Sequence, residues 1–89
     1  MKNTKQLERI VRAFANHRRI QILGLLSRDP GMSVIDIADK LSVNFKTLSE
    51  HLRRLFVAGL IEKRNRSTKV EHRLTTLGKQ ALKFLRALE

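Results

Sequence analysis

The chain has 89 residues and a formal net charge of +11, and it contains no cysteine, tryptophan or tyrosine. This length suits a single domain, residues 1–89, and an apolar share of 42% is typical of a folded protein rather than a disordered basic tail. The lack of cysteine excludes disulfides and thiolate chemistry. No apolar run approaches the ~20 residues that cross a bilayer, and the first residues lack the apolar segment of a secretion signal. We therefore expect a cytoplasmic protein whose charge attracts nucleic acid rather than a membrane.

The first half of the sequence predicts two amphipathic helices. The first covers about residues 4–15, and Asn3 with Gln6 forms its capping box. Its apolar residues recur at helical spacing, at Leu7, Ile10, Val11 and Phe14. The second helix, residues 17–27, follows the capping residue Asn16. Its apolar residues, which cover so wide an arc that we expect this helix at the centre of the core, are Ile20, Ile22, Leu23, Leu25 and Leu26.

A third, short helix and a longer fourth helix come next. Ser33 with Asp36 opens the third helix. Its inward residues are Val34, Ile37, Ala38 and Leu41. After a tight turn, the fourth helix covers about residues 44–58, with Asn44 as its cap and Gly59 just beyond its end. The residues expected to be buried on it are Leu48, Leu52, Leu55 and Phe56.

The remaining chain predicts a hairpin and a last helix. Two strands, at residues 60–65 and 70–74, flank a polar tip at residues 66–69. The side chains expected to face the core are Ile61, Val70 and Leu74, and His72 shares their alternation and is interpreted as structural. Thr76 is predicted to cap a final helix over residues 77–88. The predicted fold is mainly α with a small β-hairpin, in the order α-α-α-α-β-β-α.

The third and fourth helices have the spacing of a helix-turn-helix. Ala38 supplies the small residue where the two helices cross, and Ser42 lies in the turn, where a residue must tolerate an unusual backbone conformation. Leu48 then anchors the second helix of the pair on the first. Because a basic hairpin follows, the sequence predicts a winged helix-turn-helix.

Four segments resemble ArsR-like transcriptional regulators. Residues 15–23 (ANHRRIQIL) resemble the opening of their second helix, and residues 41–55 (LSVNFKTLSEHLRRL) resemble their recognition helix. Residues 58–64 (AGLIEKR) are similar to the start of their wing, and residues 74–78 (LTTLG) are similar to a strand-to-helix junction also found in MarR- and PadR-like regulators. The resemblance covers about residues 7–88 and implies a prokaryotic winged-helix regulator.

The sequence departs from the metal-sensing members of that family. Many of them carry cysteines on the first helix of the motif, whereas residues 33–38 (SVIDIA) contain none. Others use histidines and acids of the last helix, which here offers only the terminal Glu89. We expect no metal and no cofactor, and no small-molecule effector site is evident. The histidines His17, His51 and His72 fall in separate elements and no phosphate loop is present, so we expect no enzyme.

Recognition helices read base edges with exposed residues of their N-terminal half. Lys46 can donate to guanine or phosphate and Ser49 can serve either, while Phe45 can contact a thymine methyl group or pack in the core. Glu50 can accept from cytosine or pair with Arg54, which we favour. The family position of His51 favours a donor role over that of a polar residue at the helix edge. The full set of candidate DNA contacts is Ser33, Asn44, Phe45, Lys46, Thr47, Ser49, Glu50, His51, Arg53, Arg54, Arg64, Arg66, Lys69 and Arg73.

Within this set the hairpin is expected to contact phosphates. Its basic residues include Arg64, Arg66 and Lys69, and no acid lies among residues 63–69. The alternative is a charged hairpin that only protects its own edges. The hydroxyls of Ser33 and Thr47 lie near helix starts, where backbone phosphates can be bound.

The first and last helices carry more apolar surface than so small a monomer can cover. The predicted dimer interface consists of Leu7, Ile10, Val11, Phe14, Ala81, Phe84, Leu85 and Leu88. The alternative is that both helices only cover the core. We expect a dimeric, sequence-specific double-stranded DNA-binding regulator, a repressor associated with the nucleoid. The alternatives are a winged-helix RNA-binding or protein-interaction adaptor and an architectural DNA-binding protein.

Overall fold

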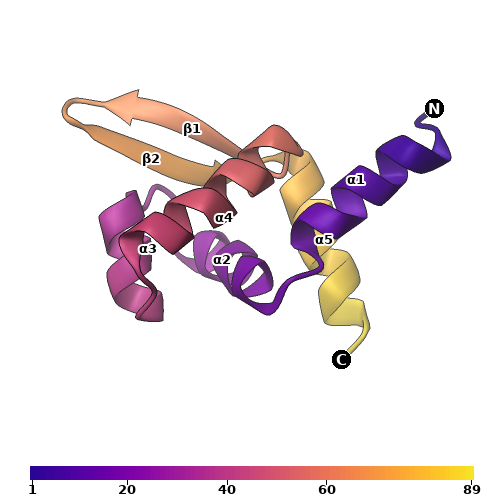
Figure 1. The fold of residues 1–89 in the computed structure, drawn as a ribbon, viewed down its shortest axis with the longest axis horizontal. Helices are drawn as coiled ribbons and strands as arrows, with labels where there is room; N and C mark the ends of the chain where they lie inside the picture. The colour runs from indigo at the N-terminus through magenta and orange to yellow at the C-terminus, as the bar shows by residue number, and fades with distance from the viewer.

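The computed structural model describes all 89 residues, and its element order is the predicted one. The elements are α1 (Thr4–Phe14), α2 (His17–Arg28), α3 (Val34–Leu41), α4 (Phe45–Val57), β1 (Ile61–Arg66), β2 (Lys69–Leu74) and α5 (Thr76–Ala87). In Figure 1, α4 crosses the front of the molecule and α2 lies behind it. The antiparallel hairpin projects to the side of α3, whereas α1 and α5 lie at the opposite end (Figure 1). None of the helices is long and apolar enough to span a membrane.

The helices begin at the predicted polar residues. Asn3 with Gln6 and Ser33 with Asp36 form complete capping boxes, and Asn16 and Asn44 cap α2 and α4 through their side-chain oxygens. Each cap accepts a backbone N–H that the first helical turn leaves without a partner. These contacts involve neighbours in the sequence, which is why the pattern of residues sufficed to locate them.

The cap of α5 was predicted one residue too late. Thr75, not Thr76, precedes the helix, and its Oγ1 accepts a hydrogen bond from the Gly78 N–H at 3.1 Å. The same hydroxyl donates to the Gly59 carbonyl at 2.6 Å. Two adjacent threonines offer the same local chemistry, and this second contact, across 16 residues, favours the first of them.

The centre of the core is α2, as its wide apolar arc predicts. Ile22, Leu23, Leu25 and Leu26 are fully buried, and Ile20 is half-buried. The four fully buried residues belong to one cluster whose members on α3, α4 and β1 include Ile37, Leu48, Leu52, Leu55 and Ile61. The winged-helix scaffold is thus built around a single helix that is covered from several sides.

The turn of the helix-turn-helix has the predicted geometry. Ser42 adopts a left-handed conformation, with φ 54° and ψ 45°, and the Val43 N–H donates to the Ala38 carbonyl at 3.0 Å. Ala38 itself is buried where α3 meets α4. The polar, unbranched side chain of Ser42 tolerates a conformation that most residues avoid.

His72 is a buried structural residue at the base of the hairpin, as predicted. It is 1% exposed, and its Nδ1 lies 2.9 Å from the Met32 carbonyl. Met32 and His72 also form an isolated β-bridge, which ties the loop before α3 to β2. Burial lowers the pKa of His72, so the neutral imidazole is favoured at this site.

Two residues predicted to be buried are exposed. Phe56, on the last turn of α4, is 44% exposed, and the Lys63 Nζ lies 4.7 Å from its ring centroid. Val70 is 39% exposed because the hairpin extends past the core at that position. The strands also reach Arg66 and Lys69, so the turn is two residues shorter than predicted. Helical and strand periodicity indicate which way a side chain points, not whether another element covers it.

The residues predicted to form a dimer interface divide into two groups. Phe14 and Ala81 are buried inside this single chain, and Ile10 and Leu85 pack against its core. The exposed residues are Leu7 at 50%, Val11 at 50%, Phe84 at 55% and Leu88 at 68%. An apolar surface therefore remains on α1 and α5, although both helices also cover the core.

Candidate nucleic-acid interface

The exposed face of α4 presents several of the predicted DNA contacts to solvent. Lys46 and Ser49 make no side-chain hydrogen bond or ion pair within the chain. Phe45 is 55% exposed, so the alternative in which its ring packs in the core is excluded. The Asn44 oxygen accepts from the backbone N–H groups of Lys46 and Thr47 and is occupied as a cap. The free groups on the first turns of α4 are thus an ammonium, an aromatic ring and the hydroxyls of Thr47 and Ser49.

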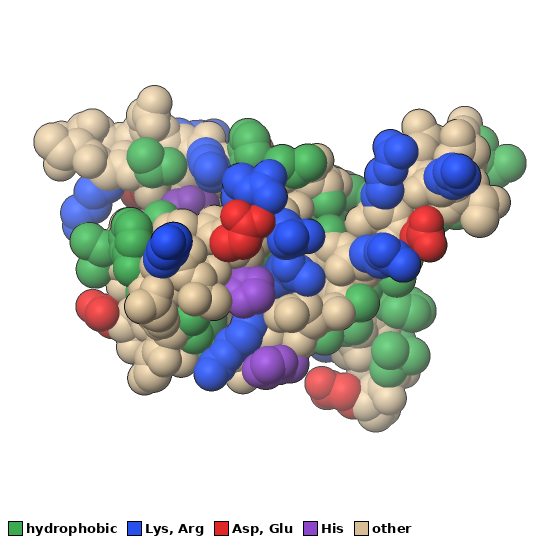
Figure 2. All heavy atoms as spheres, viewed as in Figure 1, with side chains coloured by type: hydrophobic (Ala, Val, Ile, Leu, Met, Phe, Trp, Pro, Cys, Tyr) green, Lys and Arg blue, Asp and Glu red, His purple; other side chains and the backbone are tan.

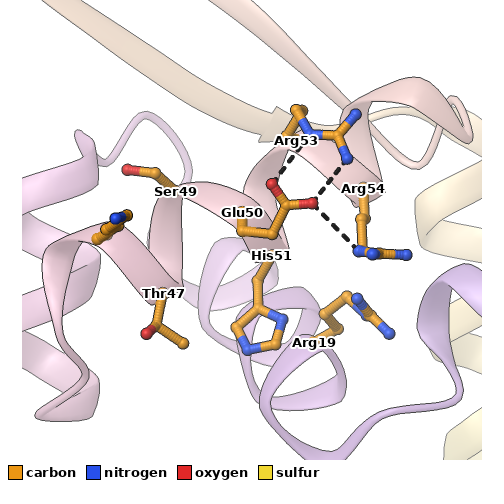
Figure 3. A pocket seen from close by; sticks show the side chains of 8 residues that line it. Arg19, Thr47, Ser49, Glu50, His51, Arg53 and Arg54 are labelled. Carbon is orange, nitrogen blue, oxygen red and sulfur yellow. Dashed lines mark hydrogen bonds and ion pairs between the residues drawn. The ribbon is translucent and has the colours of Figure 1, made fainter.

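Glu50 holds two arginines on the second half of α4 (Figure 3). Arg53 donates to it from Nε at 3.0 Å and from Nη2 at 2.6 Å, and the Arg54 Nε lies 3.2 Å from Oε1. The favoured pairing of Glu50 with Arg54 is present, and Arg53 joins it. The hydrogen bonds from Arg53 lower the pKa of Glu50. Because both carboxylate oxygens are engaged, Glu50 orients guanidinium groups rather than presenting a free acceptor.

His51 lies on the side of α4 that faces α2, and it lines the same open hollow as Lys46 and Ser49. It is half-buried, and its Nδ1 has no hydrogen-bond partner. Burial and then the nearby Arg19 lower its pKa. Figure 3 shows the imidazole and the Arg19 guanidinium side by side, below Glu50. Sequence analysis missed Arg19 as part of this surface because α2 and α4 meet only through the tertiary fold.

The remaining candidates lie on other elements. The hairpin exposes Arg64, Arg66 and Lys69. Arg73 is half-buried at the base of the hairpin, and its Nη2 lies 3.9 Å from the Glu71 Oε1. The Ser33 hydroxyl accepts from the Asp36 N–H at 3.2 Å as part of a cap. The candidate contacts on α4 therefore lie together on one helix. On the hairpin, the exposed basic residues near the tip are separate from the half-buried Arg73 at the base. The thirteen-residue helix and the hairpin form two basic elements joined by a short turn.

Basic side chains gather on the face of the molecule that carries α4 (Figure 2). In Figure 2, Lys and Arg side chains lie over α4 and over α1 on the same face, with few acidic groups between them. No group of three or more His, Cys, Asp or Glu side chains is placed to hold a metal ion. A positive face of this kind attracts polyanions, since it raises the local potential over a surface larger than a single contact.

A short helix, a left-handed turn, an exposed basic helix and a basic hairpin define a winged helix-turn-helix protein. The sequence profile described as "Bacterial regulatory protein, arsR family" matches residues 16–63. The chain therefore belongs to the ArsR family of bacterial regulatory proteins. The resemblance found in the sequence is confirmed over the segment that contains α2, the helix-turn-helix and the start of β1.

Named relatives agree with this assignment. The chain is 34% identical over 68 residues to the uncharacterized HTH-type transcriptional regulator MJ1325 of Methanocaldococcus jannaschii. The match covers 76% of this chain and 76% of the relative. The chain is also 38% identical over 69 residues to the HTH-type transcriptional regulator Rv0324 of Mycobacterium tuberculosis. That match covers 78% of this chain but only 30% of the relative's length. Both relatives are named as regulators rather than enzymes.

Solved structures share the fold over almost the whole chain. One is a winged helix-turn-helix DNA-binding domain of Mb0332 from Mycobacterium bovis, described as homodimeric, with a TM-score of 0.85 and 30% identity. The match covers 94% of this chain and 78% of that one. HlyU from Vibrio cholerae has a TM-score of 0.84 and 32% identity, and the match covers 98% of this chain and 95% of HlyU.

Proposed function

We propose that the protein is a homodimeric, sequence-specific DNA-binding repressor that places α4 in the major groove and the hairpin on the phosphate backbone. The observation that carries this proposal is the exposed face of α4, on which Lys46 and Ser49 have no partner within the chain. Free donors on a helix of this length match the hydrogen-bonding edges of bases in the major groove. The exposed ring of Phe45 adds an apolar contact suited to a thymine methyl group.

Different residues are proposed to supply sequence specificity and sequence-independent affinity for DNA. Lys46, Ser49 and Phe45 read base edges, whereas Arg64, Arg66 and Lys69 of the hairpin contact phosphates without regard to sequence. Support for this division comes from the hairpin, where the three basic residues are exposed and surround the turn between the strands. Phosphate contacts from such a position fix the register of α4 in the groove.

A homodimer is proposed because α1 and α5 leave apolar surface uncovered. Leu7, Val11, Phe84 and Leu88 are each at least half exposed in the single chain. Packing these helices across a two-fold axis would bury that surface and hold two recognition helices about 34 Å apart, one turn of DNA. The similar domain from Mycobacterium bovis is described as homodimeric, which supports the same arrangement here.

Repression, rather than activation, is proposed because it requires contacts with DNA only. A dimer bound across an inverted repeat at a promoter blocks polymerase by occupying DNA, and it needs no surface dedicated to recruiting polymerase. Association with the nucleoid follows from the same DNA binding. An architectural role would instead use the phosphate contacts alone.

The decisive experiment measures binding to duplex DNA over a salt series, after sites have been selected from random DNA. We expect an inverted repeat, and an affinity for it that falls steeply with salt. Lys46→Ala should cost about 1–3 kcal/mol on the selected site and little on other DNA. Lys69→Ala should weaken all duplexes alike and reduce the salt slope by about 1.8, since a dimer loses one phosphate contact in each subunit. Equal binding to every duplex would identify an architectural protein, and no binding at low salt would overturn the proposal.

The dimer is tested separately by sedimentation. Leu7→Glu combined with Phe84→Glu should convert the dimer into a folded monomer, because it introduces charges into the proposed interface. Ile35→Glu is the matched control, since Ile35 is 61% exposed on α3 and lies outside that interface. A wild-type chain that sediments as a monomer at micromolar concentration would contradict the dimer.

A further inference from the structure

An arginine-lined cleft of about 450 Å³ lies between α1, α2 and the second half of α4. Its basic residues are Arg9 and Arg12 of α1, Arg19 of α2, and Arg53 and Arg54 of α4. Ala13, Val57 and Ala58 supply its apolar walls. Its volume lies within the ~300–1,000 Å³ of small-molecule sites. Arg9 and Arg12 recur with Lys5 at the spacing of a solvent-exposed helix face, so nothing in the linear pattern indicates this cleft.

The cleft has more positive charge than the chain neutralises. Glu50 is shared by two of the arginines, and Glu8 approaches Arg12 only weakly, at 3.8 Å between two exposed side chains. Arg9 and Arg19 form no ion pair. Five guanidinium groups therefore face two carboxylates.

Arg19 shows the imbalance most directly. Its Nε is buried and has no hydrogen-bond partner. Burial and the nearby Arg54 charge lower its pKa, which means that like charges crowd a partly desolvated group. A buried donor without an acceptor normally costs stability, so such groups often mark a site where a ligand supplies the acceptor.

The chemistry of the lining selects the class of ligand. Guanidinium groups are planar and bind phosphate oxygens in pairs through charge-assisted hydrogen bonds. The lining has no aromatic side chain on which a base could stack. Phosphate oxygens, rather than a nucleobase, therefore match this cleft.

We propose that the cleft between α1 and α4 is a phosphate-binding site, with Arg9, Arg12 and Arg19 as ligands beside the pair held by Glu50. Arg19, Arg53 and Arg54 also line the adjoining hollow on the exposed face of α4, so the site continues that face toward α1. Figure 2 shows basic side chains on both sides of this junction. The phosphate comes either from the DNA backbone beside the major groove or from a free phosphorylated molecule. Only the first source rests on the proposed function.

The first arm of the test uses inorganic pyrophosphate as the probe. Arginine Nε–Hε signals of the full chain are followed by NMR at constant ionic strength, with chloride as the balancing anion. We expect saturable shifts of the Arg9, Arg12 and Arg19 signals. In Arg9→Gln/Arg12→Gln the binding should weaken by roughly tenfold, about the value of one charged hydrogen bond. Lys79→Gln/Lys83→Gln removes the same charge from exposed positions on α5 and should bind like wild type.

The second arm measures duplex DNA affinity against salt for the same three proteins. A salt slope reduced by about 0.9 for each lost phosphate contact, in the Arg9→Gln/Arg12→Gln variant alone, identifies the DNA backbone as the source. Pyrophosphate binding lost in that variant with an unchanged slope identifies a free phosphorylated ligand. The proposal is overturned if the arginine variant and the lysine control have the same pyrophosphate affinity and the same salt slope of DNA binding. It is also overturned if the arginine variant sediments as a monomer where wild type is a dimer. A chain that binds no DNA but binds pyrophosphate at these arginines would refute only the proposed function.

Discussion

The interior around α2 and the apolar surface on α1 and α5 arise from similar sequence patterns but differ in structure. Leu23 of α2 has no exposed surface, whereas Leu7 and Val11 of α1 are half exposed. Both helices place apolar residues at helical spacing, and the wider apolar arc of α2 predicts its central position, but neither pattern identifies the elements that cover the helix. The difference is the number of neighbours: α2 is covered by α1, α3, α4, α5 and β2, while the outer half of α1 extends away from the body (Figure 1).

An apolar stripe therefore indicates that a helix face needs to be covered, but it does not identify the element that covers it. In α2 this need is met within the chain, and substitutions there should act on folding. On α1 and α5 it is met only in part, and substitutions there should act on association. Unfolding free energies of variants at both places test this difference.

The largest effect is expected in the interior. Leu23→Ala should lower the free energy of unfolding by about 2–5 kcal/mol, because it removes buried methyl groups and leaves a cavity. Leu88→Ala is the matched control at the other place, 68% exposed at the C-terminal cap of α5. Its effect should stay within about 0.5 kcal/mol in dilute protein. Denaturant unfolding checks both, and equal losses would contradict the division between interior and surface.

A smaller effect is expected where α5 joins the interior. A Cβ on Gly78 would collide with the backbone carbonyl of Leu60, which cannot move aside as a side-chain end can. Gly78→Ala should therefore destabilise by about 1–3 kcal/mol. Gly24→Ala in α2 meets no atom within 4 Å of the new Cβ and should stabilise by about 0.4–1 kcal/mol. Thermal unfolding of both variants gives the sign of each change, and a neutral Gly78→Ala would mean that α5 is as loosely fitted at its start as at its end.

The smallest effect is a pH dependence of the interior. Burial holds the pKa of His72 below its ordinary value of 6.5, so the unfolded chain binds a proton first as the pH falls. The stability that the neutral, buried His72 contributes is fully present above pH 6.5 and decreases as the pH drops toward the lowered pKa. The slope for one group is at most about 1.4 kcal/mol per pH unit.

Unfolding free energies measured from pH 7.5 down to pH 5 test this dependence. His72→Gln should flatten the slope. His51 acts in the same direction, because burial also lowers its pKa, and it accounts for the slope that remains. An unchanged slope in His72→Gln would show that this histidine does not contribute.

Sequence analysis predicted the local features well. The four polar caps before α1 to α4 and the left-handed Ser42 were located because each depends on residues within a few positions of one another. Phe56 and Val70 were predicted wrongly for the opposite reason. Their exposure depends on where α2 and the core end, which no short window of sequence contains.

The candidate site divides in the same way. The pairing of Glu50 with Arg54 was predictable, because residues four apart meet on one helix. The approach of Arg19 to His51, and of Arg9 and Arg12 to the second half of α4, was not. These residues belong to three helices, and only packing sets the distances among them.

Residue patterns in the sequence were sufficient to assign the class of fold and the family, and its net charge of +11 favours a polyanionic partner. Periodicity, caps and the helix-turn-helix spacing are short-range properties, and they survive in the linear chain. The tertiary structure decided which of the 19 basic residues act together. Electrostatic interactions depend on distance in space, and a cleft made by α1, α2 and α4 has no counterpart in the order of residues.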